Sequence, residues 1–303
     1  MQKIKQMIIK TDAFQCITAR LHQRKRRKEL EAMYQAGIEI YRSYQPPKPS
    51  GEPSDYIWLC WWQGVQNMTP LVRECYNRIV RFNPEKRVIL ITEDNLGQYV
   101  TLPAWILKKY ERGNISKTHM SDILRAELLA KYGGVWMDAT IYTFGPIPDH
   151  IYKKGLYTGR CRYNKKDFNV SRNRWTSYFW ATPYPGHTFF CFLRDFWHTY
   201  WKTHDALIEY FLIDYVIDLG CHTVPFIRRE LDAVEVGGCG TDFWMLLKLL
   251  QEDFDPAVLD QIARSNWMQK LSYKGEECIQ QKAAHPEHTF YKVLFADNHK
   301  MEQ

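Results

Sequence analysis

The sequence predicts an α/β protein whose central sheet is mainly parallel and covered by helices on both faces. Three short, almost wholly apolar segments alternate with longer segments whose apolar residues recur at three- and four-residue steps. The apolar segments are 55–62, 87–92 and 135–142. Strands that are apolar on both faces belong to parallel sheets buried between helices. Ligands of such sheets bind beyond the carboxyl ends of the strands, so functional side chains are expected there.

A helix with a clear beginning is predicted between the first two strands, over 69–83. Thr69 is a residue type that caps helices, and a proline follows it where the first turn accepts one. Leu71, Cys75 and Ile79 fall on one face of this helix, which predicts that this face packs on the sheet.

Further helices are predicted from apolar periodicity, the strongest of them ending at the paired glycines before the third strand. Glycine suits that end because a helix often stops at a residue with positive φ. These helices cover 101–110, 117–134, 210–220 and 242–253. Residues 266–274 form a short apolar and basic segment.

The N-terminal part of the chain is predicted to be a separate helical segment. Residues 1 to about 45 read as helical, and their second half carries one apolar stripe. The stripe consists of Leu30, Met33, Tyr34, Gly37, Ile38 and Tyr41. A stretch rich in Pro, Gly and Ser follows at 45–54 and reads as a linker. We therefore expect two parts, an N-terminal segment with its linker over 1–50 and a main domain over 51–303.

Positive charge is concentrated in this N-terminal segment. The first 28 residues hold nine Lys or Arg residues and one acid, whereas the net charge of the whole chain is +7. The main domain is therefore near neutral, and a nucleic-acid-binding protein is not expected. Two interpretations of residues 1–45 remain open. The basic helix could contact an anionic membrane surface, or it could pack on the domain with its charged end in solvent.

The cysteines and the N-terminus favour a cytoplasmic protein. The eight cysteines are scattered singly, with no C-x-x-C pair and no metal-like spacing. Several lie in apolar runs, where free buried cysteine is common in a reducing compartment. The first residues have too short an apolar core for a secretory signal, and no run approaches the ~20 apolar residues of a membrane span. The inner face of the membrane is where the basic segment would act.

The stretch YGGVWMDATIY, residues 132–142, places one carboxylate, Asp138, in what otherwise reads as a buried strand. An isolated charge is costly to bury, so pairing, a raised pKa or coordination of a cation is expected. If 135–142 is one strand, Asp138 and Thr140 lie on the same face. Two oxygen ligands at this spacing suit a hard divalent cation such as Mg²⁺ or Mn²⁺. Such a cation can hold a diphosphate and offset its charge.

Asp122 and Arg125 lie three residues apart on one face of the predicted helix 117–134. They could form an intrahelical ion pair, which contributes little when exposed. Alternatively, they could form a polar clamp for the hydroxyl groups of a ligand. Spacing alone favours the ion pair.

The stretch SDILRAELLAKYGGVWMDATIY resembles the signature of DXD-type glycosyltransferases. These include family 32 transferases, capsular polysaccharide transferases and the glucosylating clostridial toxins, and the resemblance is strongest to the capsular polysaccharide synthesis transferases. Six segments occur in that family's order and span roughly 55–275. They are IWLCWWQGVQNMTPLV, LPAWI, KYERGNIS, SDILRAELLAKYGGVWMDAT, IEYFLIDYVI and QKLSYK.

The resemblance implies a GT-A fold, which is a Rossmann-like domain that binds a nucleotide sugar. It implies transfer of a hexose from a nucleotide-diphosphate donor, with UDP favoured, to a polysaccharide or lipid-linked glycan, and it favours retention of anomeric configuration. By this resemblance Asp122 and Arg125 hold the donor sugar's hydroxyls. Asp138 matches the first Asp of the DXD motif, which faces the metal, the ribose and the diphosphate.

The resemblance also implies roles for aromatic and basic residues. Trp62, in WWQG, matches the aromatic that stacks on the base, with a core tryptophan as the alternative and Trp61 as the second candidate. Lys270 and Lys274, in QKLSYK, could meet the diphosphate, with ordinary surface lysines as the alternative.

Thr140 departs from the DXD pattern, because a hydroxyl stands where a second carboxylate is usual. The capsular-type members resemble this sequence in reading DAT, yet a hydroxyl is a weaker metal ligand, which puts tight metal dependence in doubt. A later Asp214, Asp242 or His285 could complete the metal shell. Asp214 is also a candidate to deprotonate the acceptor hydroxyl, although the sequence alone favours a structural core or surface aspartate.

Together these expectations describe a metal-assisted hexosyltransferase of capsule or surface polysaccharide synthesis. Two alternatives stay open. One is transfer of sugar to a protein acceptor, as the toxins perform it. The other is a non-catalytic nucleotide-sugar-binding scaffold of an assembly complex, in which Thr140 would mark lost catalysis.

Overall fold

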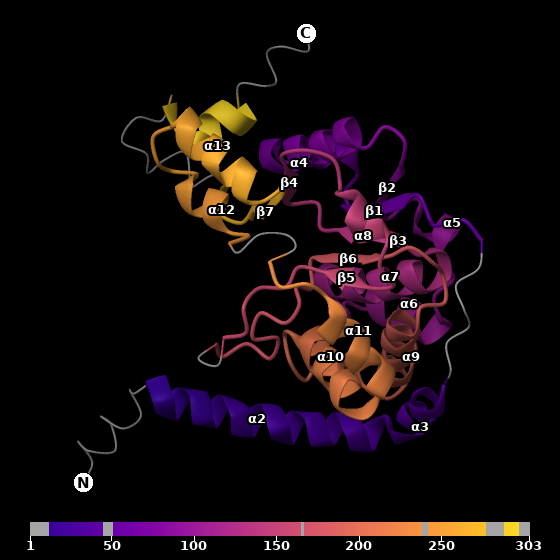
Figure 1. Cartoon of the computed structure of the whole chain (residues 1–303). Helices are drawn as coiled ribbons and strands as arrows, with labels where there is room; N and C mark the ends of the chain where they lie inside the picture. The colour runs from indigo at the N-terminus through magenta and orange to yellow at the C-terminus, as the bar shows by residue number, and fades with distance from the viewer. Residues whose placement is uncertain (1–11, 45–50, 165–166, 238–241, 277–287, 297–303) are drawn as a thin grey trace.

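The computed structural model describes residues 12–44, 51–164, 167–237, 242–276 and 288–296, and a five-stranded sheet lies at its centre (Figure 1). The sheet order is β2-β1-β3-β6-β5. The strands are β1 (Tyr56–Cys60), β2 (Arg87–Ile91), β3 (Gly134–Met137), β5 (Tyr157–Thr158) and β6 (Phe179–Thr182). β1 runs parallel to β2 and β3, whereas β6 is antiparallel to both β3 and β5. The predicted α/β class, with a sheet built on a parallel core and with added helices, is confirmed.

The register brings aromatic residues together at the centre of this sheet. Trp58 pairs with Trp136 across β1 and β3, and Trp136 pairs with Trp180 across β3 and β6. All three indoles are buried. Their burial explains why β1, β3 and β6 are apolar on both faces, as strands covered by helices must be.

The helix between β1 and β2 forms as the sequence predicts. α4 (Pro70–Phe82) begins at Thr69, whose side chain accepts a hydrogen bond from the Val72 N–H at 3.4 Å. The predicted apolar face is buried completely, and it consists of Leu71, Cys75 and Ile79. Capping and periodicity therefore agree, and both sequence predictions for this helix are confirmed.

Three helices connect β2 to β3, namely α5 (Leu96–Tyr99), α6 (Ala104–Glu111) and α7 (Lys117–Tyr132). α7 lies against both the sheet and α9 (Thr188–Thr203), so its residues from His119 to Ala130 are mostly buried. Ser116 caps α7 by accepting from the His119 N–H at 3.2 Å. The helix is thus held at its start and along its length, which gives it a fixed position relative to β3.

Two glycines form the junction between α7 and β3. Gly133 and Gly134 have φ of 65° and 93°. A Cβ on Gly134 would lie 2.4 Å from the Tyr56 carbonyl oxygen, so no side chain fits there. The predicted glycine stop of α7 is confirmed, and the second glycine lets β3 approach β1.

The single strand predicted over 135–142 is wrong, because the structure divides this segment into two strands. β3 ends at Met137, a turn follows in which the Ile141 N–H donates to the Asp138 carbonyl at 3.0 Å, and β4 (Ile141–Thr143) joins another sheet. β4 pairs antiparallel with β7 (Met268–Lys270). The turn places Asp138 beyond the carboxyl end of β3, where a ligand site of an α/β sheet is expected.

The remaining elements flank the sheet on two sides in Figure 1. α12 (Met245–Leu249), α13 (Pro256–Ser265), the π-helical turn Lys292–Ala296 and the β4-β7 pair gather near α4. α10 (Leu212–Thr223) and α11 (Pro225–Ala233) gather near α9, and the short α8 (Asp149–Tyr152) and the 3-10 turn Val65–Asn67 complete the fold. The helix predicted over 242–253 begins only at Met245, because the Asp242 side chain accepts from the Trp244 N–H at 3.0 Å and forms a turn instead.

The N-terminal segment is helical and packs on this body. α2 (Asp12–Met33) and α3 (Gln35–Ser43) run along the side of the molecule that carries α9, α10 and α11 (Figure 1). Leu30, Tyr34, Ile38 and Tyr41 are buried, so the predicted apolar stripe packs on the domain. The linker prediction falls partly on 45–50, outside the described residues, and the division at residue 50 stays a prediction.

Two findings concern the membrane and the cysteines. Among the described residues, no helix combines the length and the apolarity needed to cross a bilayer. Cys60, Cys75, Cys191 and Cys221 are free thiols, whereas Cys239 and Cys278 lie outside the described residues.

Candidate active site at the end of β3

Asp138 is the carboxylate around which the candidate site is built. Its Oδ1 accepts from Trp136 Nε1 at 3.0 Å and from Arg125 Nη2 at 3.3 Å. Its Oδ2 lies 3.2 Å from Lys270 Nζ. The side chain keeps 28% of its surface exposed, so the carboxylate is paired and still reachable from solvent.

The two cations decide the charge of this carboxylate. Burial raises the pKa of Asp138, but the charges of Lys270 and Arg125 outweigh burial and hold that pKa below its usual value. Asp138 is therefore ionised at neutral pH. The Lys270 ammonium also donates to Thr140 Oγ1, so one cation contacts both oxygen-bearing residues of the DAT triplet.

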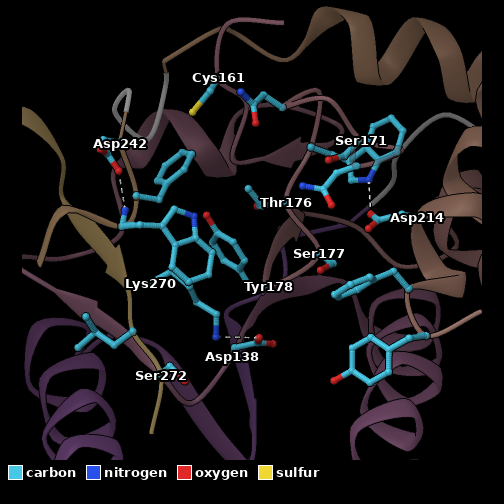
Figure 2. Close-up of a pocket in the computed structure, with 18 of the residues that line it drawn as sticks. Asp138, Cys161, Ser171, Thr176, Ser177, Tyr178, Asp214, Asp242, Lys270 and Ser272 are labelled. Atoms are coloured by element: carbon cyan, nitrogen blue, oxygen red, sulfur yellow. Dashed lines mark hydrogen bonds and ion pairs between the residues drawn. The ribbon is translucent and has the colours of Figure 1, made fainter. Parts of the chain in front are cut away.

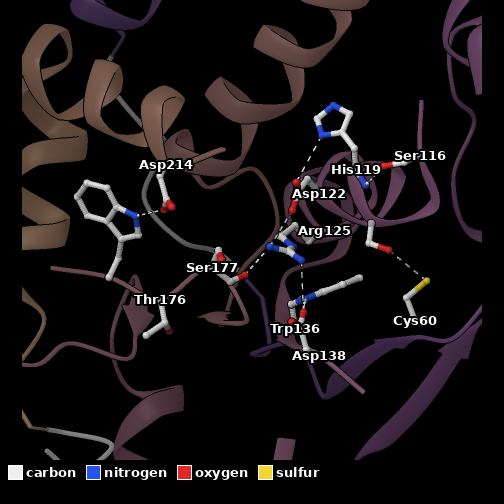
Figure 3. A network of polar contacts seen from close by, with 12 residues as sticks. Cys60, Ser116, His119, Asp122, Arg125, Trp136, Asp138, Thr176, Ser177 and Asp214 are labelled. Atoms are coloured by element: carbon white, nitrogen blue, oxygen red, sulfur yellow. Dashed lines mark hydrogen bonds and ion pairs between the residues drawn. The ribbon is translucent and has the colours of Figure 1, made fainter. Parts of the chain in front are cut away.

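Arg125 connects three parts of the site. Besides Asp138, its guanidinium meets Asp122 Oδ1 at 3.0 Å and the Ser177 carbonyl oxygen at 2.5 Å. It also lies 5.2 Å from the centre of the Trp136 ring. Only 7% of the side chain is exposed. The intrahelical ion pair suggested by the spacing is present, and it extends to the carboxylate at the end of β3 (Figure 3).

A buried histidine supports Asp122 from the other side. Trp201 Nε1 donates to His119 Nε2 at 2.9 Å, so that nitrogen carries no proton. The His119 Nδ1–H then donates to Asp122 Oδ2 at 3.4 Å. Asp122 is thus fixed between His119 and Arg125, as the chain of dashed contacts in Figure 3 shows.

Two cavities meet at Asp138 and Lys270. The small cavity, of about 250 Å³, lies between the end of β1 and the start of α7. The large cavity, of about 680 Å³, is lined by Ser171, Asn173 and residues 175–178, and by residues near α10 and β7 (Figure 2). Asp138 and Lys270 line both. The ion pair therefore stands at the boundary between two ligand-sized spaces.

Aromatic residues distinguish the small cavity. Trp62 lines it but is nearly buried, and its Nε1 donates to the Lys117 carbonyl at 3.0 Å. Trp61 is more exposed and meets the Tyr273 ring edge to face, with centroids 5.1 Å apart. Both tryptophans proposed from the sequence thus reach this cavity, and Trp61 with Tyr273 offers the more accessible ring surface.

Asp214 lines the large cavity from the first turn of α10. Trp175 Nε1 donates to its Oδ1 at 2.7 Å. Burial raises the pKa of Asp214 to about 6, and the nearby Asp122 carboxylate adds to this, against the Trp175 hydrogen bond and two arginines. Asp214 can therefore accept a proton at neutral pH more readily than an ordinary aspartate.

The other residues proposed from the sequence lie farther from this network. Asp242 and Asp214 stand at opposite sides of the large cavity in Figure 2, and Asp242 pairs with Lys248 at 2.9 Å. Lys274 is exposed and lines the large cavity rather than the small one. His285 lies outside the described residues.

The residues present define how a divalent cation could be held. Among the described residues, no three His, Cys, Asp or Glu side chains gather as a metal site. Among the described residues that line the small cavity, Asp138 is the one carboxylate, Thr140 lies beside it, and Lys270 contacts both. Such a set fits an ion that takes one protein carboxylate, water and substrate phosphates, which is a usual arrangement for Mg²⁺.

Residues 6–294 match the family model for capsular polysaccharide synthesis proteins. The chain belongs to this family. An O-glycosyltransferase, braB of Annulohypoxylon truncatum, is 30% identical over 107 residues, which cover 32% of this chain and 25% of that protein. The alignment thus spans a quarter of the curated relative's length.

A solved structure was also found that is similar to this member of the capsular polysaccharide synthesis family. The PaToxG glycosyltransferase aligns over 82% of this chain and 99% of its own, with 13% identity and a TM-score of 0.37.

Several residues of the site were not proposed from the sequence. They are His119, Trp136, Trp201 and Tyr273. His119 had a local signal, because it stands three residues before Asp122 on the same helical face. Trp136 is also local, since it stands two residues before Asp138. Trp201 and Tyr273 meet the site through contacts between segments that are distant in the sequence, and a single sequence carries no spacing signal for such contacts.

Proposed function

We propose that this member of the capsular polysaccharide synthesis family is a glycosyltransferase. It would transfer a hexose from a nucleotide-diphosphate sugar, with UDP as the favoured nucleotide, to a polysaccharide or lipid-linked glycan. One observation carries the proposal. The charged pair Asp138 and Lys270 lines both cavities, so a diphosphate held there would leave the nucleotide on one side and the acceptor on the other.

The nucleotide would occupy the small cavity. Trp61 and Tyr273 present ring surface there, and Trp62 forms a rigid wall behind it. Aromatic faces stack on any base at a gain of about 1–3 kcal/mol. The preference for UDP over other nucleotides rests on the family resemblance alone.

The donor sugar would lie beside Asp122 and Arg125. Asp122 has fixed contacts on both of its oxygens, from Arg125 and from His119, and each carboxylate oxygen can accept a further hydrogen bond. A hydroxyl of the sugar would therefore meet an acceptor that is already oriented. Orientation before binding lowers the entropy that the reaction must lose.

Lys270 would stabilise the leaving diphosphate. As the bond between the anomeric carbon and the diphosphate breaks, negative charge grows on the phosphate oxygens and positive character on the sugar. A fixed ammonium next to that oxygen lowers the barrier. Arg125 lies on the same carboxylate and keeps Asp138 ionised, and the exposed Lys274 would add charge from the large cavity.

A bound Mn²⁺ or Mg²⁺ would supply further positive charge to the diphosphate. Asp138 would hold it as the one protein carboxylate, with Thr140 as a weaker oxygen ligand. Because one carboxylate gives little affinity, we propose that the apoprotein binds Mn²⁺ weakly and that UDP strengthens the binding.

The acceptor would enter the large cavity. Tyr210, Phe211 and Trp244 line it and are exposed by 65%, 58% and 39%, and exposed rings are surfaces on which sugar faces pack. Asp214 lies in the same cavity and would take the proton from the attacking hydroxyl. Retention of configuration is part of the proposal on the strength of the family resemblance.

The exposed part of α2 supports a peripheral membrane contact through the N-terminal segment. Ile17 and Leu21 are 55% and 59% exposed one turn apart, and Lys25 and Lys28 follow on the exposed surface of the same helix. Apolar residues next to basic ones suit an anionic interface. We therefore propose that the protein works at the inner face of the membrane, where lipid-linked acceptors lie.

Calorimetric titration of the full chain with UDP, GDP and CMP, each with and without Mn²⁺, tests the proposal. We expect one nucleotide to bind, Mn²⁺ to tighten it, and Asp138→Asn to remove the effect of Mn²⁺ while Glu111→Gln, on the exposed end of α6, keeps it. Absence of binding by all three nucleotides would contradict the proposed donor site. Binding of an intact nucleotide sugar that is never consumed with glycan acceptors would instead favour the scaffold interpretation.

A further inference from the structure

A third cavity, of about 360 Å³, lies between α2, α10 and the loop around residue 172. Five arginines and one acid line it, and we call it the arginine pocket. These residues are Arg20, Arg24, Arg27, Arg172, Arg174 and Asp218. It shares no lining residue with the large or the small cavity. The transfer reaction proposed above makes no use of it.

The helical spacing of α2 directs three arginines to this pocket. Arg20, Arg24 and Arg27 follow one another at steps of four and three residues, which places them on one face. Arg26, on the neighbouring face of the same helix, differs because glutamates pair with it. Arg26 is neutralised there by Glu29 at 2.5 Å and by Glu209 at 3.0 Å.

One carboxylate fixes two of the arginines without neutralising the pocket. Asp218 meets Arg27 at 2.8 Å and Arg174 at 2.9 Å, one with each oxygen. Its side chain is only 7% exposed. Arg24 reaches the pocket from an exposed position at its edge, and Asp218 is the one carboxylate among the lining residues, so the described lining attracts an anion.

The loop side of the pocket is also built in detail. Arg172 adopts φ of 46°, in the left-handed region that non-glycine residues seldom occupy. Its guanidinium donates to the Gln23 side chain, which itself donates to the Phe168 carbonyl at 2.7 Å. Within the described residues, the buried Arg172 Nε meets no hydrogen-bond acceptor. A buried charged donor without an acceptor points to a ligand oxygen.

We propose that the arginine pocket binds a phosphate or diphosphate group. Guanidinium groups match phosphate oxygens with paired hydrogen bonds, and several arginines held in place by Asp218 and Gln23 form a preorganised set. The phosphate can belong to a lipid headgroup or to a soluble molecule, and the two sources share this chemistry. The site does not depend on the transfer reaction proposed above.

Calorimetric titration with inorganic pyrophosphate tests the pocket. It is performed without divalent metal on the full chain carrying Lys270→Met, so that the candidate active site contributes little. Arg20→Gln/Arg24→Gln is compared with Lys25→Gln/Lys28→Gln, which removes the same charge from exposed positions of the same helix. We expect the arginine pair to weaken binding about tenfold or more and the lysine pair less than about twofold. Arg172→Gln tests the loop side, and we expect a loss like that of the arginine pair.

Vesicle sedimentation separates the two sources of phosphate. Vesicles with phosphatidic acid, whose headgroup is a phosphomonoester, are compared with phosphatidylserine vesicles of equal charge. A preference for phosphatidic acid that Arg172→Gln removes assigns the pocket to a lipid headgroup. Pyrophosphate binding without that preference assigns it to a soluble phosphate. Pyrophosphate binding weaker than about 1 mM, or equal losses in the arginine and lysine pairs, overturns the proposal.

Discussion

Lys270 Nζ lies 3.2 Å from Asp138 Oδ2, so a cation from β7 neutralises the carboxylate that follows β3. The two residues come from different sheets and distant parts of the sequence, and the turn after Met137 brings them together. A substrate phosphate that reaches this place would meet an ammonium that is already oriented. The pair is therefore the most direct point at which to test the proposed transfer.

Replacing Lys270 by Met should slow transfer about 100-fold or more, because the fixed charge next to the leaving diphosphate is lost. The matched control is Lys202→Met, which removes an exposed lysine from α9. Initial rates of nucleotide release in the presence of acceptor check this. If both variants keep full rates, Lys270 only balances the charge of Asp138.

Asp122→Asn should weaken binding of the intact nucleotide sugar more than binding of the nucleotide alone. The Asp122 carboxylate lies on α7 between His119 and Arg125, on the side proposed for the sugar. Losing one hydrogen bond from a charged acceptor costs about 1.5–3 kcal/mol. Competition binding with both ligands measures the difference. Equal losses for the two ligands would return Asp122 to a purely structural ion pair.

The transfer rate should rise with pH through a midpoint near 6 if Asp214 accepts the proton. Burial raises the pKa of this carboxyl from 3.8 to about 6, and only the ionised form can act as a base. A pH–rate profile of the intact enzyme measures the midpoint. Asp214→Asn should abolish this step in the profile, and a profile that the variant leaves unchanged would exclude Asp214 as the base.

The same pKa shift predicts a change in stability. The raised pKa favours the protonated form in the folded state, so the stability that Asp214 contributes is complete below pH 3.8 and is lost as the pH rises through about 6. At pH 7, Asp214→Asn should therefore be more stable than the natural chain, by up to about 3 kcal/mol. Urea unfolding at pH 4 and pH 7 measures this, and the gain should vanish at the lower pH.

Gly134→Ala should destabilise the fold by about 1–3 kcal/mol or more, because φ is 93° there and a Cβ would lie 2.4 Å from the Tyr56 carbonyl. Gly145→Ala is the matched control, since a Cβ at Gly145 meets nothing within 4 Å. Chemical unfolding of both variants measures the difference. Similar midpoints would mean that β3 can shift to accept a side chain.

The sequence predicted elements with local signals and failed where a turn imitates a strand. α4 and α7 have caps, periodic apolar faces and, for α7, a glycine stop, and both form as predicted. Residues 135–142 keep a two-residue apolar period across the Asp138 turn, because β3 and β4 are each buried on their own sheet. Periodicity cannot show that the chain has changed sheets.

The candidate site was predictable only in part, for a related reason. Asp122, Arg125 and Asp138 lie in one continuous motif, and the structure joins them directly. The contacts of Trp201 with His119 and of Trp175 with Asp214 depend on how α9 and α10 pack. Such packing arises only when the core assembles, so the sequence contains no residue spacing that would predict these contacts.

Segment 171–175 separates the large cavity from the arginine pocket, and its residues line the two in alternation. Ser171, Asn173 and Trp175 line the large cavity, whereas Arg172 and Arg174 line the arginine pocket. In a saturation scan of these five positions, substitutions at 171, 173 and 175 should alter sugar transfer, whereas substitutions at 172 and 174 should alter salt-sensitive anion affinity. A one-residue deletion would exchange the residues that face the two cavities and should therefore impair both activities.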